Sequence, residues 1–150
     1  MQRYTVVRLI HYFFLVLARL PIPGHKRHYI LRLAGIRFPK TDSQKYNIFI
    51  GTNVMFGTLA PTRISIGNNT LITSGTKILT HFYDPVSHKF SYGDVVIGSH
   101  VFIGVDTVIC KPVTIGDGAV IGAGSVVTKN IPPYELWAGV PARFIKKLNL

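Results

Sequence analysis

The sequence predicts one all-β domain, a solenoid of short parallel strands that follows a helical N-terminal segment. Aliphatic residues recur every six positions without a slip, at Ile97, Ile103, Ile109, Ile115, Ile121 and Val127. A glycine directly follows four of these anchors, and a small or β-branched residue comes four positions after each of the first five. With 150 residues, 47% of them hydrophobic and 15% charged, the chain suits one ordered domain with a core of its own.

A period of six residues is that of a short strand plus one tight bend of constant length. We expect each aliphatic anchor to point inward and each following glycine to allow a sharp corner. Three hexads then form a triangular coil, and successive coils stack as parallel strands roughly 4.8 Å apart around one aliphatic column. A β-sandwich with chance spacing does not explain six consecutive anchors in phase.

The first part of the chain, residues 1–46, is basic and apolar. Residues 1–45 hold nine Lys or Arg against one acid, Asp42, out of a net charge of +11. The run Leu9–Ala18 is shorter than the roughly 20 apolar residues that span a bilayer. Arg8 and the lack of a cleavage site argue against a secretory signal. Pro21 and Pro23 end this first helix.

A second helix is expected from about His25 to Ala34, with Gly35 as its cap. Its apolar residues would oppose its basic ones: Ile30, Leu31, Leu33 and Ala34 against Lys26, Arg27 and Arg32. Two interpretations stay open: residues 1–24 contact an anionic membrane surface peripherally, or the helices pack on the domain or on a neighbouring subunit. No nucleic-acid-binding motif accompanies the charge, so we expect no nucleic-acid partner.

The second part, residues 47–150, contains the repeat and a short C-terminal extension. Ile50 and Phe56 begin the repeat, which continues through Ile66, Ile72 and Ile78 after about four inserted residues near Pro61 and Arg63. The anchors are then lost over residues 80–95, a stretch with two histidines and several aromatic residues. An irregular loop inside a regular solenoid is a common place for a functional site.

Three stretches, IGSHVFIG, TIGDGAVIGAGSVVTKNIPP and AGVPARFIKK, resemble the hexapeptide-repeat acyltransferases, which are left-handed parallel β-helices. The resemblance covers about residues 47–148 and is closest to the maltose, galactoside and polysaccharide O-acetyltransferase branch. It implies left-handed coils, a homotrimer, and acetyl-CoA in the groove between adjacent β-helices. It also implies transfer of an acetyl group to a sugar hydroxyl, here of a surface polysaccharide or its precursor.

His81, in ILTHFYDP, aligns with the catalytic histidine of that family. A neutral imidazole is a suitable base for the proton of an attacking hydroxyl. Asp84 would either orient His81 or accept a hydrogen bond from the sugar. His88 is expected to be exposed and His100 to be a turn residue. We expect no metal site, and a structural rather than nucleophilic Cys110.

The resemblance also implies contacts to the coenzyme. Phe102 would form an aromatic wall, Val105 a backbone contact near the thioester, and Ala123 a backbone contact to the pantetheine arm. The remaining contacts, to the nucleotide end and the phosphates, would come from Thr128, Lys129, Arg143 and Lys146. Trp137 would either stack on adenine or pack.

The sugar-binding Asn and Asp of the family are not visible in the early coils, which read VMFGTLAPTR. The acceptor is therefore less well defined than the acetyl donor. The alternatives are N-acetylation of a nucleotide-linked amino sugar and a non-catalytic β-helix scaffold. A single cysteine favours a cytoplasmic location, with or without peripheral contact to the cytoplasmic membrane face.

Overall fold

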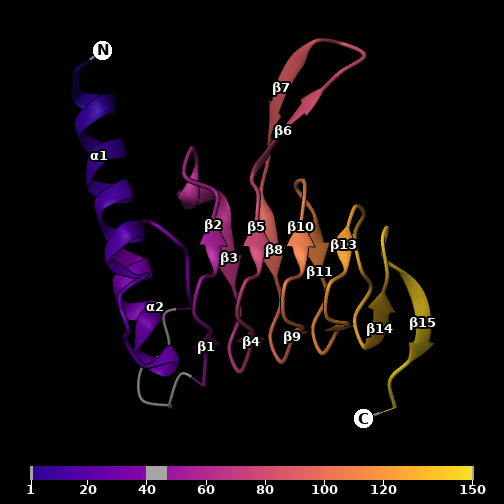
Figure 1. Ribbon diagram of the computed structural model, residues 1–150. Coiled ribbons are helices and arrows are strands. Elements are labelled where there is room, and N and C mark those ends of the chain that lie inside the picture. Colours follow the sequence, from indigo (N-terminus) through magenta and orange to yellow (C-terminus); the bar gives the residue numbers. More distant parts are fainter. Residues whose placement is uncertain (1, 40–46, 150) are drawn as a thin grey trace.

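The computed structural model describes residues 2–39 and 47–149 of the chain. The segment that leads up to the expected boundary after residue 46, with Lys40, Asp42 and Lys45, lies outside the described residues. The helices α1 (Gln2–Leu17) and α2 (Gly24–Leu33) come first. A stack of coils follows and extends away from them (Figure 1).

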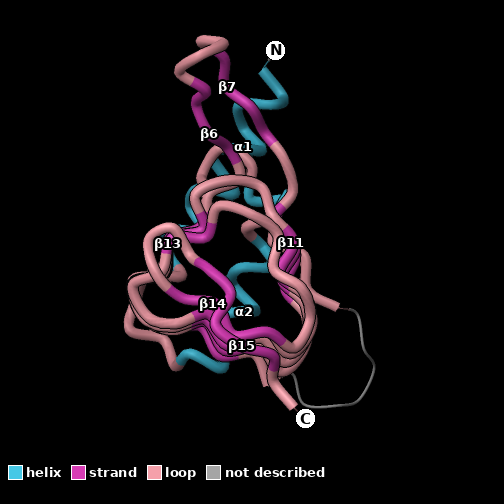
Figure 2. Tube along the Cα trace, turned by 90° about the vertical axis from the view of Figure 1, so that its right-hand side faces the viewer, coloured by secondary structure: helices cyan, strands magenta, loops and turns pink. Residues whose placement is uncertain are grey.

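Each coil passes through three parallel sheets in turn. Sheet 1 contains β1 (Phe49–Ile50), β4 (Leu71–Ile72), β9 (Phe102–Ile103), β12 (Val120–Ile121) and β14 (Glu135–Ala138), with β15 (Arg143–Lys147) antiparallel at its edge. Sheet 2 contains β2 (Met55–Phe56), β5 (Lys77–Ile78), β10 (Val108–Ile109) and β13 (Val126–Val127). Sheet 3 contains β3 (Ile64–Ile66), β8 (Val95–Ile97) and β11 (Thr114–Ile115). Figure 2, turned by 90°, shows the coils nearly superimposed.

The expected anchors form the core of this solenoid. Every anchor from Ile50 to Val127 is buried, and in-phase anchors are paired across neighbouring coils, as in Ile72 with Ile103 and Ile103 with Ile121. The small residues four positions after the anchors are buried as well. Several of their hydroxyls bond to carbonyls, for example Thr107 Oγ1 to the oxygen of Gly104 at 2.7 Å. The six-residue period therefore predicted the inward-facing side chains correctly.

The glycines that follow the anchors differ in role from the expectation. At the corner between sheets 1 and 2, a residue with a positive φ, the left-handed conformation, lies two positions after the residue that follows each anchor. In successive coils this residue is Asn53, Gly75, Asp106 and Gly124. The corner between sheets 3 and 1 repeats this with Asn69, His100, Gly118 and Tyr134. A Cβ on Gly67 would instead lie 2.5 Å from the carbonyl carbon of Gly98 in the next coil. These glycines permit close approach between coils, while the left-handed residue forms the corner.

The corner between sheets 2 and 3, which we call the insertion corner, lacks this pattern and holds both insertions. In the first coil a 3₁₀ turn at Pro61–Arg63 occupies the place of the inserted residues. In the second coil the chain leaves the solenoid as an antiparallel hairpin of β6 (His81–Asp84) and β7 (Lys89–Tyr92). The expected irregular loop at 80–95 is thus a regular hairpin that projects beyond the coils (Figures 1 and 2).

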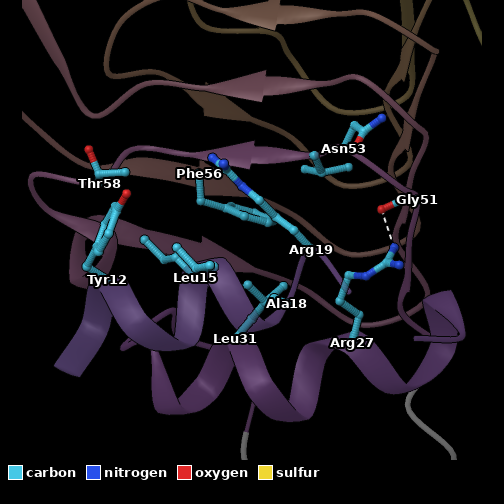
Figure 3. Close-up of a pocket in the computed structure, with 12 residues that line it drawn as sticks. Tyr12, Leu15, Ala18, Arg19, Arg27, Leu31, Gly51, Asn53, Phe56 and Thr58 are labelled. Carbon is cyan, nitrogen blue, oxygen red and sulfur yellow. Dashed lines mark hydrogen bonds between the residues drawn. The ribbon is translucent and has the colours of Figure 1, made fainter. Parts of the chain in front are cut away.

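The two helices pack against the first coil, and they share its core. Leu15, Ala18 and Leu31 point toward the strands (Figure 3), and the space left beside them has a volume of about 10 Å³, too small for a substrate. The expected polarity of α2 is confirmed in part: Leu31 and Ala34 are buried and Lys26 is exposed, but Arg27 is buried and Leu33 is exposed. Arg27 is inside because its guanidinium bonds to carbonyls of the first coil. Neither of the described helices is long and apolar enough to cross a membrane.

Candidate functional site

His81 lies at the base of the hairpin, where the chain leaves the insertion corner. Its backbone pairs with Tyr92, and the two rings lie 6.1 Å apart, centroid to centroid. The side chain is half-buried, and Nδ1 has no hydrogen-bond partner among the described residues. A buried ring nitrogen without a partner is costly, so a group from outside this chain would stabilise it.

Asp84 lies at the other end of β6, next to the hairpin turn, and its carboxylate serves that turn. Oδ1 accepts a bond of 2.9 Å from the amide of Val86, and Oδ2 accepts one of 2.7 Å from the hydroxyl of Ser87. The Ser87 hydroxyl and then the Val86 amide lower the pKa of Asp84 below its ordinary value. The structure therefore does not bring Asp84 to His81, and the expected contact that would orient His81 is not formed in this chain.

The predicted coenzyme residues lie on three different parts of the solenoid. Thr128 and Lys129 lie on the insertion corner, in the fourth coil, on the same edge as His81 in the second. Val105 and Ala123 lie on the corner between sheets 1 and 2, in neighbouring coils joined by a bond from the Gly124 amide to the Val105 carbonyl. The phenyl ring of Phe102 is exposed on sheet 1 between the flanking strands β4 and β12.

The C-terminal extension carries the remaining predicted residues. Arg143 and Lys146 are exposed on β15, which pairs with β14 at the edge of sheet 1. Trp137 is buried, donates to Glu135 Oε2 at 2.8 Å and packs edge-on against Phe144. Trp137 is therefore a packing residue in this chain, whereas Arg143, which donates to the Ala142 carbonyl at 3.1 Å, and Lys146 lie on the exposed surface.

Six of the seven predicted coenzyme residues are exposed, and Thr128 is half-buried, so each has surface available for a ligand. They divide, however, between two edges of the triangular solenoid and the sheet that ends at β15. One chain alone does not gather them around His81. A site that uses all of them requires the edge of one solenoid to face another.

The other histidines and the cysteine have local roles. His88 is exposed near the hairpin turn, with its Nδ1 3.0 Å from the hydroxyl of Tyr83. His100 is a left-handed corner residue, with its Nε2 3.0 Å from the side-chain amide of Asn69. Cys110 is half-buried and donates from its thiol to the Val127 carbonyl. Among the described residues, no three His, Cys, Asp or Glu side chains cluster as a metal site would require.

A cleft that sequence reasoning missed lies between α1 and the insertion of the first coil. It has a volume of about 670 Å³ and is lined by Val7, Arg8, His11, Thr58, Leu59, Ala60, Pro61, Thr62 and Arg63. Arg63 also lies 3.6 Å from Asp94, which follows the hairpin, so the cleft adjoins the hairpin base. The inserted residues were the only feature of the sequence that pointed to this cleft, because nothing in the sequence places α1 beside them.

Repeating three-sheet coils, broken at one corner by a hairpin that carries a histidine, define a hexapeptide-repeat solenoid with a candidate catalytic edge. The profile of the family described as bacterial transferase hexapeptide (six repeats) matches residues 94–129. A maltose O-acetyltransferase structure from Clostridium difficile 630 is 32% identical, with a TM-score of 0.66, and covers 97% of this chain and 88% of its own. The chain belongs to the hexapeptide-repeat acyltransferases.

Two further similarities agree with this assignment. A hexapeptide-repeat acetyltransferase from Vibrio cholerae O1 biovar eltor, solved with acetyl coenzyme A, is 27% identical with a TM-score of 0.73, over 97% of this chain and 88% of its own. The galactoside O-acetyltransferase of Escherichia coli strain K12 is 42% identical over 92 residues, which are 57% of this chain. The chain spans 45% of the length of that relative and 60% of the Bacillus subtilis protein YvoF.

Proposed function

We propose that the protein is an acetyl-CoA-dependent O-acetyltransferase, a homotrimer of left-handed β-helices that acetylates a sugar hydroxyl of a surface polysaccharide or its precursor. The observation that carries the proposal is the position of His81 at the one hairpin that interrupts the described coils, with a buried ring nitrogen that has no hydrogen-bond partner within the described part of the chain. The acetyl donor is supported by the relatives solved with acetyl coenzyme A or coenzyme A. A cytoplasmic location stays a prediction.

Acetyl-CoA would supply the acetyl group as a thioester. The neutral imidazole of His81 would accept the proton of the acceptor hydroxyl while that oxygen attacks the thioester carbonyl. The C–O bond forms, the C–S bond breaks, and the imidazolium returns its proton to the departing thiolate. No group is oxidised or reduced, and no acyl-enzyme is needed, which agrees with a thiol at Cys110 that bonds to a carbonyl within the coil.

The division of predicted residues between edges supports a site shared by two copies. His81, Thr128 and Lys129 would come from the insertion corner of one solenoid. Val105 and Ala123 would come from the corner between sheets 1 and 2 of its neighbour. Arg143 and Lys146 would lie at the rim of the shared site, where they would bind phosphates. Cyclic symmetry places such unlike surfaces together at every interface of a trimer.

The acceptor would enter through the cleft between α1 and the first insertion. The cleft is large enough for a sugar, and Arg8 and His11 line it together with Arg63, which is also ion-paired with Asp94. These groups favour a glycan that carries a carboxylate or phosphate. One structural relative, 31% identical over 67% of this chain with a TM-score of 0.57, is a polySia-specific acetyltransferase.

Replacement of the base tests this function. His81→Ala should lower kcat by about two to four orders of magnitude, the usual contribution of a general base, with little change in coenzyme affinity. His88→Ala, in the same hairpin, is the matched control and should keep kcat within a few-fold. Acetyl transfer from labelled acetyl-CoA to hydroxyl and amino sugars measures both and separates O- from N-acetylation. Unchanged turnover in His81→Ala, or no binding of acetyl-CoA by calorimetry, would instead favour the scaffold alternative.

A further inference from the structure

The outer surface formed by α1 and α2 is apolar, which is unusual for the end of a solenoid. We call it the end face; it consists of Val6, Leu9 and Phe13 from α1 and Tyr29 and Leu33 from α2. Leu9 and Phe13 are 63% and 60% exposed, and Tyr29 and Leu33 are 58% and 57% exposed. Side chains of this kind are normally on the inner face of a helix.

The spacing shows that the end face points away from the core. Val6, Leu9 and Phe13 follow one another at intervals of three and four residues, so they share one side of α1. The opposite side carries Leu15 and Ala18, which pack on the first coil (Figure 3). Both sides of α1 are therefore apolar, but only one of them is covered.

The helices lie at the N-terminal end of the coil stack (Figure 1). Terminal elements of a solenoid usually present a polar outer face, because no further repeat covers them. Contacts between solenoids that lie edge to edge, as in the proposed trimer, would involve the sheets and corners and leave this end open. The end face therefore needs a different partner.

Charge identifies the kind of partner. Residues 2–39 contain no Asp or Glu, and the basic residues Arg8, Arg19 and Lys26 belong to the two helices or their junction. Two copies that met through their end faces would bring two strongly positive segments together, which is unfavourable. An apolar face on an acid-free segment, with the exposed Lys26 on the same side of α2 as Tyr29 and Leu33, instead suits a bilayer that carries anionic lipid, since a long basic side chain can reach the headgroups.

We propose that the end face binds peripherally to an anionic membrane surface. α1 would lie flat in the interface, because its other side remains packed on the first coil. The solenoid would then extend away from the bilayer, with the cleft beside α1 nearest to the headgroup region. Such a position would present the cleft to acceptors that are attached to lipid.

Apolar contacts are tested with vesicles of phosphatidylcholine and phosphatidylglycerol in a flotation assay. The double variant Leu9→Asn/Phe13→Asn should reduce binding at least about tenfold, because two large apolar side chains no longer enter the bilayer. Ile145→Asn is the matched control: Ile145 is 55% exposed on β15, at the opposite end of the stack, and its replacement should leave binding unchanged. Melting curves of each variant establish that the fold is retained, which the outward position of these residues favours.

Electrostatic contacts are tested separately. Lys26→Gln, at an exposed residue on the same side of α2 as Tyr29 and Leu33, should weaken binding by about fivefold, at about one kcal/mol for each basic residue near the surface. Vesicles of phosphatidylcholine alone, or high salt, should weaken binding of the wild type in the same direction. The proposal is overturned if the wild type does not float with anionic vesicles, or if Leu9→Asn/Phe13→Asn and Ile145→Asn bind equally well. Sedimentation gives a further test. If the wild type does not bind vesicles but forms end-to-end pairs, and Leu9→Asn/Phe13→Asn dissociates those pairs, the proposal is also overturned.

Discussion

Arg27 holds the helical segment to the solenoid through a single guanidinium group. Its Nη1 donates to the carbonyls of Ile50 and Gly51 at the start of the first coil. Its Nη2 donates to the carbonyls of Ile22 at 2.8 Å and Leu20 at 3.4 Å, in the turn between the helices. One side chain therefore donates to carbonyls of two segments, of which the Leu20 carbonyl also accepts from the amide of Ile22.

Arg27→Met keeps the apolar stem and removes these donors. We expect it to lower the free energy of unfolding by about 2–4 kcal/mol, because several carbonyls become unsatisfied at once. Lys26→Met, the preceding and exposed residue of the same helix, is the matched control and should change stability by less than about 0.5 kcal/mol. Denaturant unfolding followed by circular dichroism measures both, and equal effects of the two variants would contradict a special role for Arg27.

His28, the next residue, makes stability depend on pH. Burial first, and then the positive charge of Arg32, lowers the pKa of His28 below its ordinary value. Below about pH 6.5 the unfolded chain then binds more protons than the folded chain, so stability is lost as the pH falls through the unfolded pKa. Between about pH 7 and pH 5, the melting temperature of His28→Leu should fall by less than that of the wild type. Parallel melting curves in that window would contradict this assignment.

At the scale of elements, the hairpin β6–β7 carries the candidate base and depends on its own turn. Asp84 accepts bonds from the amide of Val86 and the hydroxyl of Ser87, so it is expected to position His81 through the hairpin and not by contact. Ser87→Ala should then lower kcat in the same direction as Asp84→Asn, by about two- to tenfold, since each removes a bond of the turn. If Asp84 contacted the reacting groups, Asp84→Asn would reduce kcat strongly and Ser87→Ala would have no effect. Hydrogen exchange of the hairpin amides should rise in both variants.

The sequence predicts these elements unevenly, for physical reasons. The six-residue period determines which residues face inward, and each anchor from Ile97 to Val127 is buried as expected. The corner residue is less predictable, because Asn53, Asp106 and His100 adopt the left-handed conformation as Gly75 does. The prediction for α2 failed at Arg27, because long-range bonds place its side chain inside, and only the fold brings Ile50 and Gly51 near it. Likewise, β6 alone does not reveal that Asp84 bonds within its turn.

At the scale of the whole molecule, the solenoid is continuous but its predicted site is not. His81 and Lys129 share the insertion corner, whereas Ala123 lies on the corner between sheets 1 and 2. A triangular coil keeps these edges apart in every repeat, since each coil contributes one strand to each sheet. Activity that needs both edges therefore needs two chains.

Co-expression of two inactive chains tests this sharing directly. His81→Ala removes the base from one edge, and Ala123→Trp fills the surface of the other, where Ala123 is exposed. When equal amounts of the two chains assemble at random into trimers with cyclic symmetry, about a quarter of all interfaces combine the intact His81 edge of one chain with the intact Ala123 edge of the other. Acetyl transfer should recover to about that fraction of the wild-type rate, whereas each variant alone stays inactive. A mixture with no recovery, in oligomers shown by differential tags to be mixed, would place the whole site within one chain.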